Sequence, residues 1–199
     1  MCSPLRVRRL RGNSSIEDAA FSCVIAMASG PIKGTKHPPL PHLGGGGRTE
    51  EIMNGIESAL SNFKDGFSCS QSVVAAYVSH FGVSRETALR LSAGFGGGMG
   101  RMAGVCGALT GAFMIVGLKY GAVSADDKKA KERTYRYVRE LANRFRSRNG
   151  SVTCKELLGC DISLPRGMEI AREKDFHATL CPKFVRDAAE ILEDLLDWV

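Results

Sequence analysis

Hydrophobic residues recur every three or four positions over most of the chain beyond its first quarter. Ile52, Ile56, Leu60 and Phe63 show this spacing, which is typical of one face of a helix. Thr49 stands at the predicted N-cap of that helix. The period-two alternation of half-buried strands is not found. The pattern therefore predicts an all-α fold.

Capping residues and helix breakers divide the rest of the pattern into further helices. The predicted starts of these helices are marked by Ser68, Ser84, Asp126 with Asp127, Ser151 with Thr153, and Cys181 with Pro182. Pro165 and Gly167 act as breakers, and we expect residues 159–175 to be irregular.

No charged residue occurs between positions 102 and 118, a stretch of 17 residues. This length is at the lower limit for a membrane span. The stretch is rich in glycine and its neighbours are amphipathic, so we expect a buried helix and no membrane span. Gly107 and Gly111 lie four apart, a spacing that lets neighbouring helices approach closely. The prediction is one domain, residues 49–199, with five to six helices around this central glycine-rich apolar helix.

Residues 1–48 have a different composition. Three prolines cluster at positions 38, 39 and 41, and residues 44–47 are all glycine. Such a segment cannot bury enough apolar surface to offset its ordering entropy, so we expect a disordered N-terminal extension. An apolar run at residues 19–28 resembles a signal sequence, but Glu17 and Asp18 interrupt its basic flank. Met53 is a plausible native start.

The net charge of +6 could indicate an anionic partner. Residues 1–50 hold seven Lys or Arg and three acidic residues, which gives +4 and leaves +2 for the remainder. The basic excess thus belongs mainly to the extension, and we expect no nucleic-acid partner for the body of the chain.

Residues 94–111, GFGGGMGRMAGVCGALTG, contain eight glycines among eighteen residues. Glycine at this density indicates close backbone approach or positive φ. We expect this loop to bring the backbone against a group of thiols, with Gly98, Gly100, Arg101 and Gly107 around any cofactor. No predicted strand precedes the loop, which argues against a dinucleotide site. Arg101 is either a positive charge beside Cys106 or a surface arginine.

The chain has seven cysteines, an odd number that is unlike a secreted disulfide scaffold. We therefore expect reduced thiols and a cytoplasmic location. Four cysteines fall at or near predicted helix starts, where unsatisfied N–H groups favour a thiolate. These are Cys69, Cys106, Cys154 and Cys181. No Cys-x-x-Cys pair occurs, so a shared site would take one cysteine from each helix. Cys160 is either a spare or an auxiliary thiol, and His177 is the one histidine worth testing as a substitute ligand or proton donor.

Four blocks of the sequence resemble the redox-active C_GCAxxG_C_C protein family. The blocks are FSCSQSVVAAY, SAGFGGGMGRMAGVCGALTGAFMIVGLKYG, TCKELLGCD and LCPKFVRDAAEIL. Cys69 matches the first cysteine of the family, and Cys154 and Cys181 match the last two. Cys106 opens the core CGALTG, in which the order is Cys-Gly-Ala. The resemblance covers about three quarters of the chain and implies redox activity that uses these four cysteines.

Three functions agree with these observations. The first is electron transfer by an iron–sulfur cluster that the four cysteines ligate, and the second is thiol–disulfide chemistry by the same residues. The third is a helical binding or structural module whose cysteines are packing residues. The sequence does not decide whether the protein is an enzyme, and it identifies neither the redox partner nor the oligomeric state.

Overall fold

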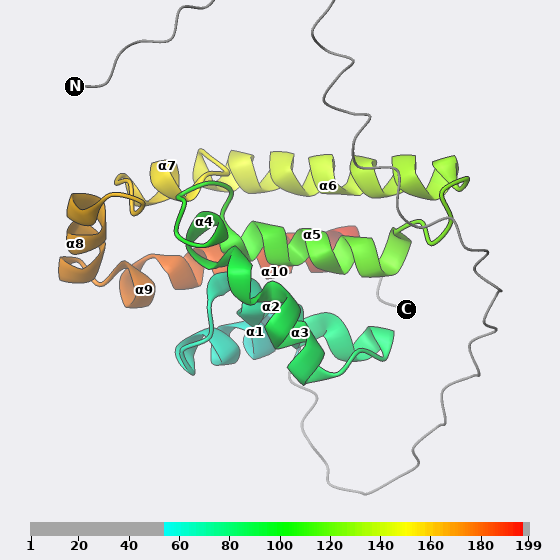
Figure 1. Ribbon diagram of the computed structural model, residues 1–199, viewed down its shortest axis with the longest axis horizontal. Helices are drawn as coiled ribbons and strands as arrows, with labels where there is room; N and C mark the ends of the chain where they lie inside the picture. Colours follow the sequence, from blue (N-terminus) through cyan, green and yellow to red (C-terminus); the bar gives the residue numbers. More distant parts are fainter. Residues whose placement is uncertain (1–53, 197–199) are drawn as a thin grey trace, which may run out of the picture. The chain divides into compact units, whose positions relative to one another are not determined.

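A computed structural model describes residues 54–196. This part of the chain is all-α, as predicted, and it contains no named strand (Figure 1). The expected disordered extension at residues 1–48 and the Thr49 cap lie outside the described residues. Within the described range no helix has the length and apolar character needed to cross a membrane.

The first helices begin at side-chain caps. In α1 (Gly55–Lys64), Asn54 accepts a hydrogen bond from the backbone of Glu57. In α2 (Cys69–Tyr77), Ser68 and Gln71 form a reciprocal capping box. Each cap satisfies backbone N–H groups that would otherwise lack a partner at the helix start. A 3₁₀ turn, η1 (Val78–Phe81), then leads to α3 (Arg85–Ser92), which Ser84 caps as predicted.

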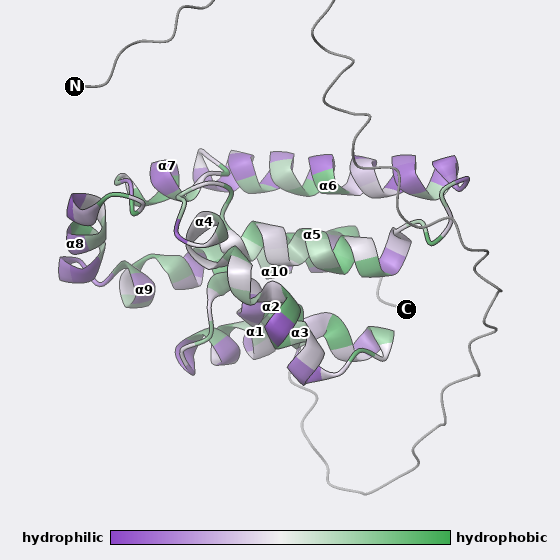
Figure 2. Ribbon diagram, viewed as in Figure 1, coloured by the Kyte–Doolittle hydropathy of each residue, from purple (hydrophilic) through white to green (hydrophobic). Residues whose placement is uncertain are grey.

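The core is built around the longer helices. The helix α5 (Gly107–Tyr120) packs against α2, against α6 (Lys128–Asn149) and against α10 (Cys181–Leu195). Figure 2 shows α5 largely apolar, whereas α6 alternates between polar and apolar turns. Gly111 permits the contact with α2, because a Cβ on it would lie 2.9 Å from the carbonyl oxygen of Ser70.

Two segments differ from the sequence prediction. Residues 102–106 are not helical, and α5 begins only at Gly107. Residues 159–175, expected to be irregular, contain α8 (Pro165–Glu173). Proline stands at its first position, where a missing N–H costs nothing, so Pro165 starts the helix rather than breaking one. With α7 (Cys154–Leu158) and α9 (Phe176–Thr179), the described chain has more helical segments than the five or six expected.

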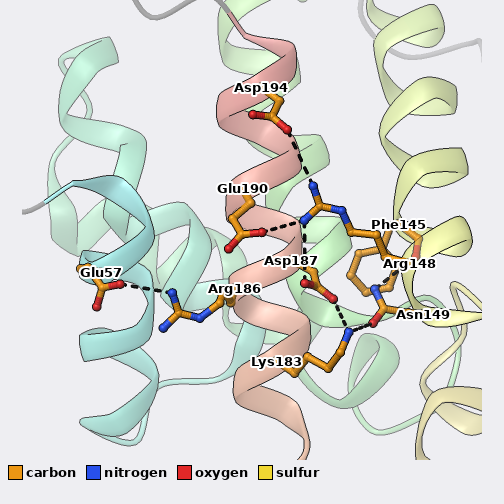
Figure 3. A network of polar contacts seen from close by, with 9 residues as sticks. All are labelled: Glu57, Phe145, Arg148, Asn149, Lys183, Arg186, Asp187, Glu190 and Asp194. Atoms are coloured by element: carbon orange, nitrogen blue, oxygen red, sulfur yellow. Dashed lines mark hydrogen bonds and ion pairs between the residues drawn. The ribbon is translucent and has the colours of Figure 1, made fainter.

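A polar network holds the start of α10 against the end of α6 (Figure 3). Lys183 Nζ lies 2.6 Å from both Asn149 Oδ1 and Asp187 Oδ2. Arg148 reaches across to Glu190 at 2.7 Å, and Arg186 joins α10 to Glu57 of α1 at 3.3 Å. The network therefore fixes the position from which Cys181 projects.

Candidate functional site

The four cysteines singled out in the sequence line one cavity of about 780 Å³. Cys69, Cys154 and Cys181 are the first residues of α2, α7 and α10, and Cys106 immediately precedes α5. All four therefore stand at helix starts, as predicted. Cys106 and Cys154 are buried, whereas Cys69 and Cys181 are half-buried. The fold thus brings together two buried cysteines and two half-buried ones.

A short backbone pairing connects the two segments that carry Cys106 and Cys154. Val105 and Thr153 form an isolated antiparallel bridge. The N–H of Cys106 donates to the carbonyl of Val152 at 2.8 Å, and the N–H of Cys154 donates to the carbonyl of Gly104 at 2.6 Å. These bonds fix the loop before α5 to the turn before α7, and they define the relative positions of Cys106 and Cys154.

Close approach explains two of the glycines. A Cβ on Gly98 would lie 2.6 Å from the backbone nitrogen of Gly104 and 2.8 Å from the Cβ of Cys154. A Cβ on Gly107 would lie 3.2 Å from the Cβ of Cys69. These distances are shorter than ordinary van der Waals contact, so a larger residue would push the cysteines away. The glycine run does bring the backbone against thiol-bearing residues.

The same run contains a left-handed helical turn around α4 (Gly96–Met99). Residues 97–101 all have φ between 61° and 68°. Met99 and Arg101 carry side chains despite this conformation, and Ala103 has φ 57°. Each such residue costs about 1–2 kcal/mol relative to a right-handed conformation. Strain of this kind is typical of functional sites, where the surrounding structure holds it in place.

Burial keeps the thiols of Cys106 and Cys154 protonated. It raises the pKa of Cys106 from 9.0 to about 11, although the N–H groups of Ala108 and Leu109 oppose the rise. It raises the pKa of Cys154 to about 12, with further contributions from Cys106 and Cys181. The expectation of thiolates at these helix starts is therefore wrong in direction for both, because loss of hydration outweighs the helix end.

The pKa values of Cys69 and Cys181 shift in opposite directions. A hydrogen bond between the thiols of Cys69 and Cys181 raises the pKa of Cys69 well above its ordinary value, and burial adds to the rise. The same bond lowers the pKa of Cys181, against the effect of burial. Of the two thiols, Cys181 is therefore the one that more readily carries negative charge. Only at Cys181 does the pKa move in the direction that the sequence predicts.

The glycine-run residues expected around the thiols also line this cavity. They are Gly98, Gly100, Arg101 and Gly107. Arg101 is exposed at the cavity rather than acting on Cys106, whose pKa owes nothing to it. His177 lines the same cavity, and its ring stacks on Phe63 with centroids 4.2 Å apart.

Sequence reasoning missed two charged residues of the cavity, Arg172 and Asp175. Both lie within residues 159–175, the segment that was expected to be irregular. Once Pro165 is recognised as the first residue of a helix, the helical spacing of Met168, Ala171 and Arg172 indicates that they share a face. That signal was available in the sequence.

Cys160 lies outside the cavity. It packs with the small cluster that contains Cys154 and Ile162, and its thiol donates to the carbonyl of Gly167 at 3.5 Å. Its nearness contributes to the raised pKa of Cys154.

A metal centre would require several ligand side chains that converge on one point. Among residues 54–196, no three His, Cys, Asp or Glu side chains are arranged to hold a metal ion. The four cysteines share a cavity, but their sulfurs do not form a ready ligand set for an iron–sulfur cluster.

Comparisons with known proteins gave one match. The family model described as "Putative redox-active protein (C_GCAxxG_C_C)" matches residues 67–195, which include all four cavity cysteines. Neither the search of curated proteins nor the search of solved structures returned a match.

Proposed function

Because the chain belongs to the C_GCAxxG_C_C family of redox-active proteins, we propose that it carries out thiol–disulfide exchange through Cys69 and Cys181. The observation that carries this proposal is the placement of Cys69 and Cys181, the first residues of α2 and α10, in one cavity that all four cysteines line. A donor thiol beside a sulfur that favours the thiolate is the arrangement that such exchange requires.

The exchange takes two steps. The Cys181 thiolate attacks one sulfur of a substrate disulfide, forms a mixed disulfide and releases the first substrate thiol. Cys69 loses its proton and attacks the Cys181 sulfur, which releases the second substrate thiol and leaves a Cys69–Cys181 disulfide. Two electrons pass from the protein to the substrate, which takes up the two protons. The reverse sequence oxidises a dithiol.

The proposal gives the surrounding structure a role. The glycine-rich α5 is its central helix, because it follows Cys106 and packs against both α2 and α10. A reducing compartment, the cytoplasm, suits the proposal because the five described cysteines are free.

Thiol counting tests the exchange. Mild oxidation of the reduced protein should remove two thiols, and peptide mapping should recover a Cys69–Cys181 cross-link. Cys160→Ser, outside the cavity, should lose the same pair, whereas Cys69→Ser should lose none. An unchanged thiol count, or a cross-link between other cysteines, would contradict the proposal.

A four-thiolate iron–sulfur centre is the second candidate. The presence of all four cysteines in one cavity supports it, although the sulfurs would have to draw closer together than they are. Anaerobic purification and reconstitution should then give coloured protein with iron and acid-labile sulfide. Cys106→Ser separates the candidates, because it would abolish a cluster and leave the Cys69–Cys181 exchange in place.

A protein whose cysteines only pack the interior is the remaining alternative. Replacing all four cavity cysteines by serine or alanine would then leave the melting temperature and the function unchanged. Both redox proposals predict the loss of function.

A further inference from the structure

Two arginines from separate segments of the chain line the cavity that holds the thiols. Arg101 belongs to the left-handed turn and Arg172 to α8, and both line the cavity. Both residues are exposed. The ion pairs found among residues 54–196 include neither of them. Asp175 is the one acidic residue among those lining the cavity in the described part.

The backbone directs the Arg101 side chain toward the cavity. A Cβ on Gly97 would lie 3.0 Å from the Cγ of Arg101, so this side chain folds back over the bare backbone of Gly97. Gly97 lines the cavity too. Arg101 has φ 64°, a conformation that glycine or asparagine would adopt at lower cost. A long cationic side chain is thus held in an unfavourable backbone conformation at the mouth of the site.

We propose that Arg101 and Arg172 bind the carboxylate groups of a small anionic disulfide, and so select the substrate whose sulfurs reach Cys181. This inference rests on the proposed thiol–disulfide exchange. A guanidinium forms paired, charge-assisted hydrogen bonds with a carboxylate, and its charge is permanent. A cavity of about 780 Å³ has the size of a small-molecule site.

Apolar side chains of the cavity suit the uncharged central part of such a disulfide. Phe63, Leu157 and Phe176 supply apolar surface in the same cavity. A short alkyl disulfide with a carboxylate at each end would place its charges on the arginines and its apolar centre on these side chains. The anionic ends also compensate for two cations that have no ion-pair partner in the described structure.

Three alkyl disulfides of similar length test the inference. They are 3,3′-dithiodipropionate, bis(2-hydroxyethyl) disulfide and cystamine, which are anionic, neutral and cationic. Each rate of oxidation of the reduced protein is divided by the rate of the same disulfide with free 1-thioglycerol, a neutral thiol that none of the three disulfides contains. The normalised second-order rate constant should be highest for the anionic compound, by about tenfold over the neutral one for each contact of about 1.4 kcal/mol. The preference should shrink as salt rises.

Variants identify the groups responsible. Arg101→Gln and Arg172→Gln should each lower the rate with the anionic disulfide about tenfold more than the rate with the neutral disulfide. Asp175→Asn should strengthen the preference, and asparagine fits the left-handed backbone of that position. Arg90→Gln is the matched control, since Arg90 pairs with Glu86 on α3 and does not line the cavity.

A non-reducible thioether dicarboxylate of the same length separates this inference from the proposed exchange. It should bind the reduced protein with an affinity that falls about tenfold in each arginine variant. Equal normalised rates for the three disulfides, or thioether binding that neither arginine variant weakens, would overturn the anion site. If no disulfide reacts but the thioether binds through the arginines, the exchange fails and the anion site stands.

Discussion

The thiols of Cys69 and Cys181 interact with each other, although the two residues begin helices that lie far apart in the sequence. This contact moves the pKa values of the two thiols in opposite directions. The proton is held on Cys69, so Cys181 is the sulfur that an electrophile should meet first.

Alkylation at neutral pH should therefore select Cys181. With limiting iodoacetamide at pH 7.5, we expect Cys181 to be labelled before Cys106 and Cys154, whose pKa values are about 11 and about 12. Cys69→Ala removes the hydrogen-bond donor and should slow the labelling of Cys181. Peptide mass spectrometry measures the order, and faster labelling of Cys106 than of Cys181 would refute the prediction.

Alkaline pH should destabilise the fold through Cys106. Its pKa rises from 9.0 to about 11 on folding, so the unfolded chain loses this proton first as pH increases. The stabilisation is fully present below pH 9 and is lost between pH 9 and pH 11. For a fully buried group this amounts to about 2–3 kcal/mol. Urea unfolding in excess reductant should show the decline, and Cys106→Ala should flatten it.

Gly98 and Gly100 form a matched pair for the left-handed turn. Both have positive φ, but only Gly98 would place a Cβ under 3.0 Å from neighbouring atoms, since the nearest atom to a Cβ on Gly100 is 3.8 Å away. Gly100→Ala should lower the free energy of unfolding by about 1–2 kcal/mol, which is the cost of the left-handed backbone conformation for alanine. Gly98→Ala should cost at least about 1 kcal/mol more and also displace Cys154. Equal unfolding free energies for the two variants would contradict the close-approach argument.

The network between α6 and α10 should contribute to stability mainly through Asp187. This carboxylate is buried and lies 2.6 Å from Lys183 Nζ. Asp187→Ala leaves Lys183 and Arg148 without that partner, and we expect a loss of about 1–3 kcal/mol in urea unfolding. Asp194→Ala is the control, because Asp194 is exposed and its pair with Arg148 should contribute less than about 1 kcal/mol. An equally large loss of stability for Asp194→Ala would contradict the prediction, because it would show that the burial of Asp187 adds nothing to the effect of its charge.

Local signals in the sequence predicted much of this structure. Ser68, Ser84 and Thr153 cap helices as expected, and the predicted helix starts identified the four cysteines that share a cavity. Such features depend on neighbouring residues, whose chemistry the sequence displays directly. Pro165 was misjudged because proline both ends and begins helices, and only the apolar spacing that follows distinguishes the two.

Other features depend on contacts that no local pattern reports. The pKa of Cys106 was expected to fall because it stands at a helix start, yet burial by distant helices raises it. The pairing of Cys69 with Cys181 needs the packing of α2 near α10. Glycine density indicated positive φ in general, but the left-handed Arg101 has a side chain and gave no such signal.

The position of Cys69 and Cys181 links oxidation to the folding equilibrium. A disulfide between them would enclose most of the described chain in one covalent loop, and a loop of that size stabilises a fold by about 5 kcal/mol in the chain-entropy account. Because this coupling is reciprocal, the folded state stabilises the disulfide by the same free energy. The folded, oxidised protein is therefore a weaker oxidant. Any substitution that loosens α10 should therefore shift the reduction potential upward, even when it lies far from sulfur.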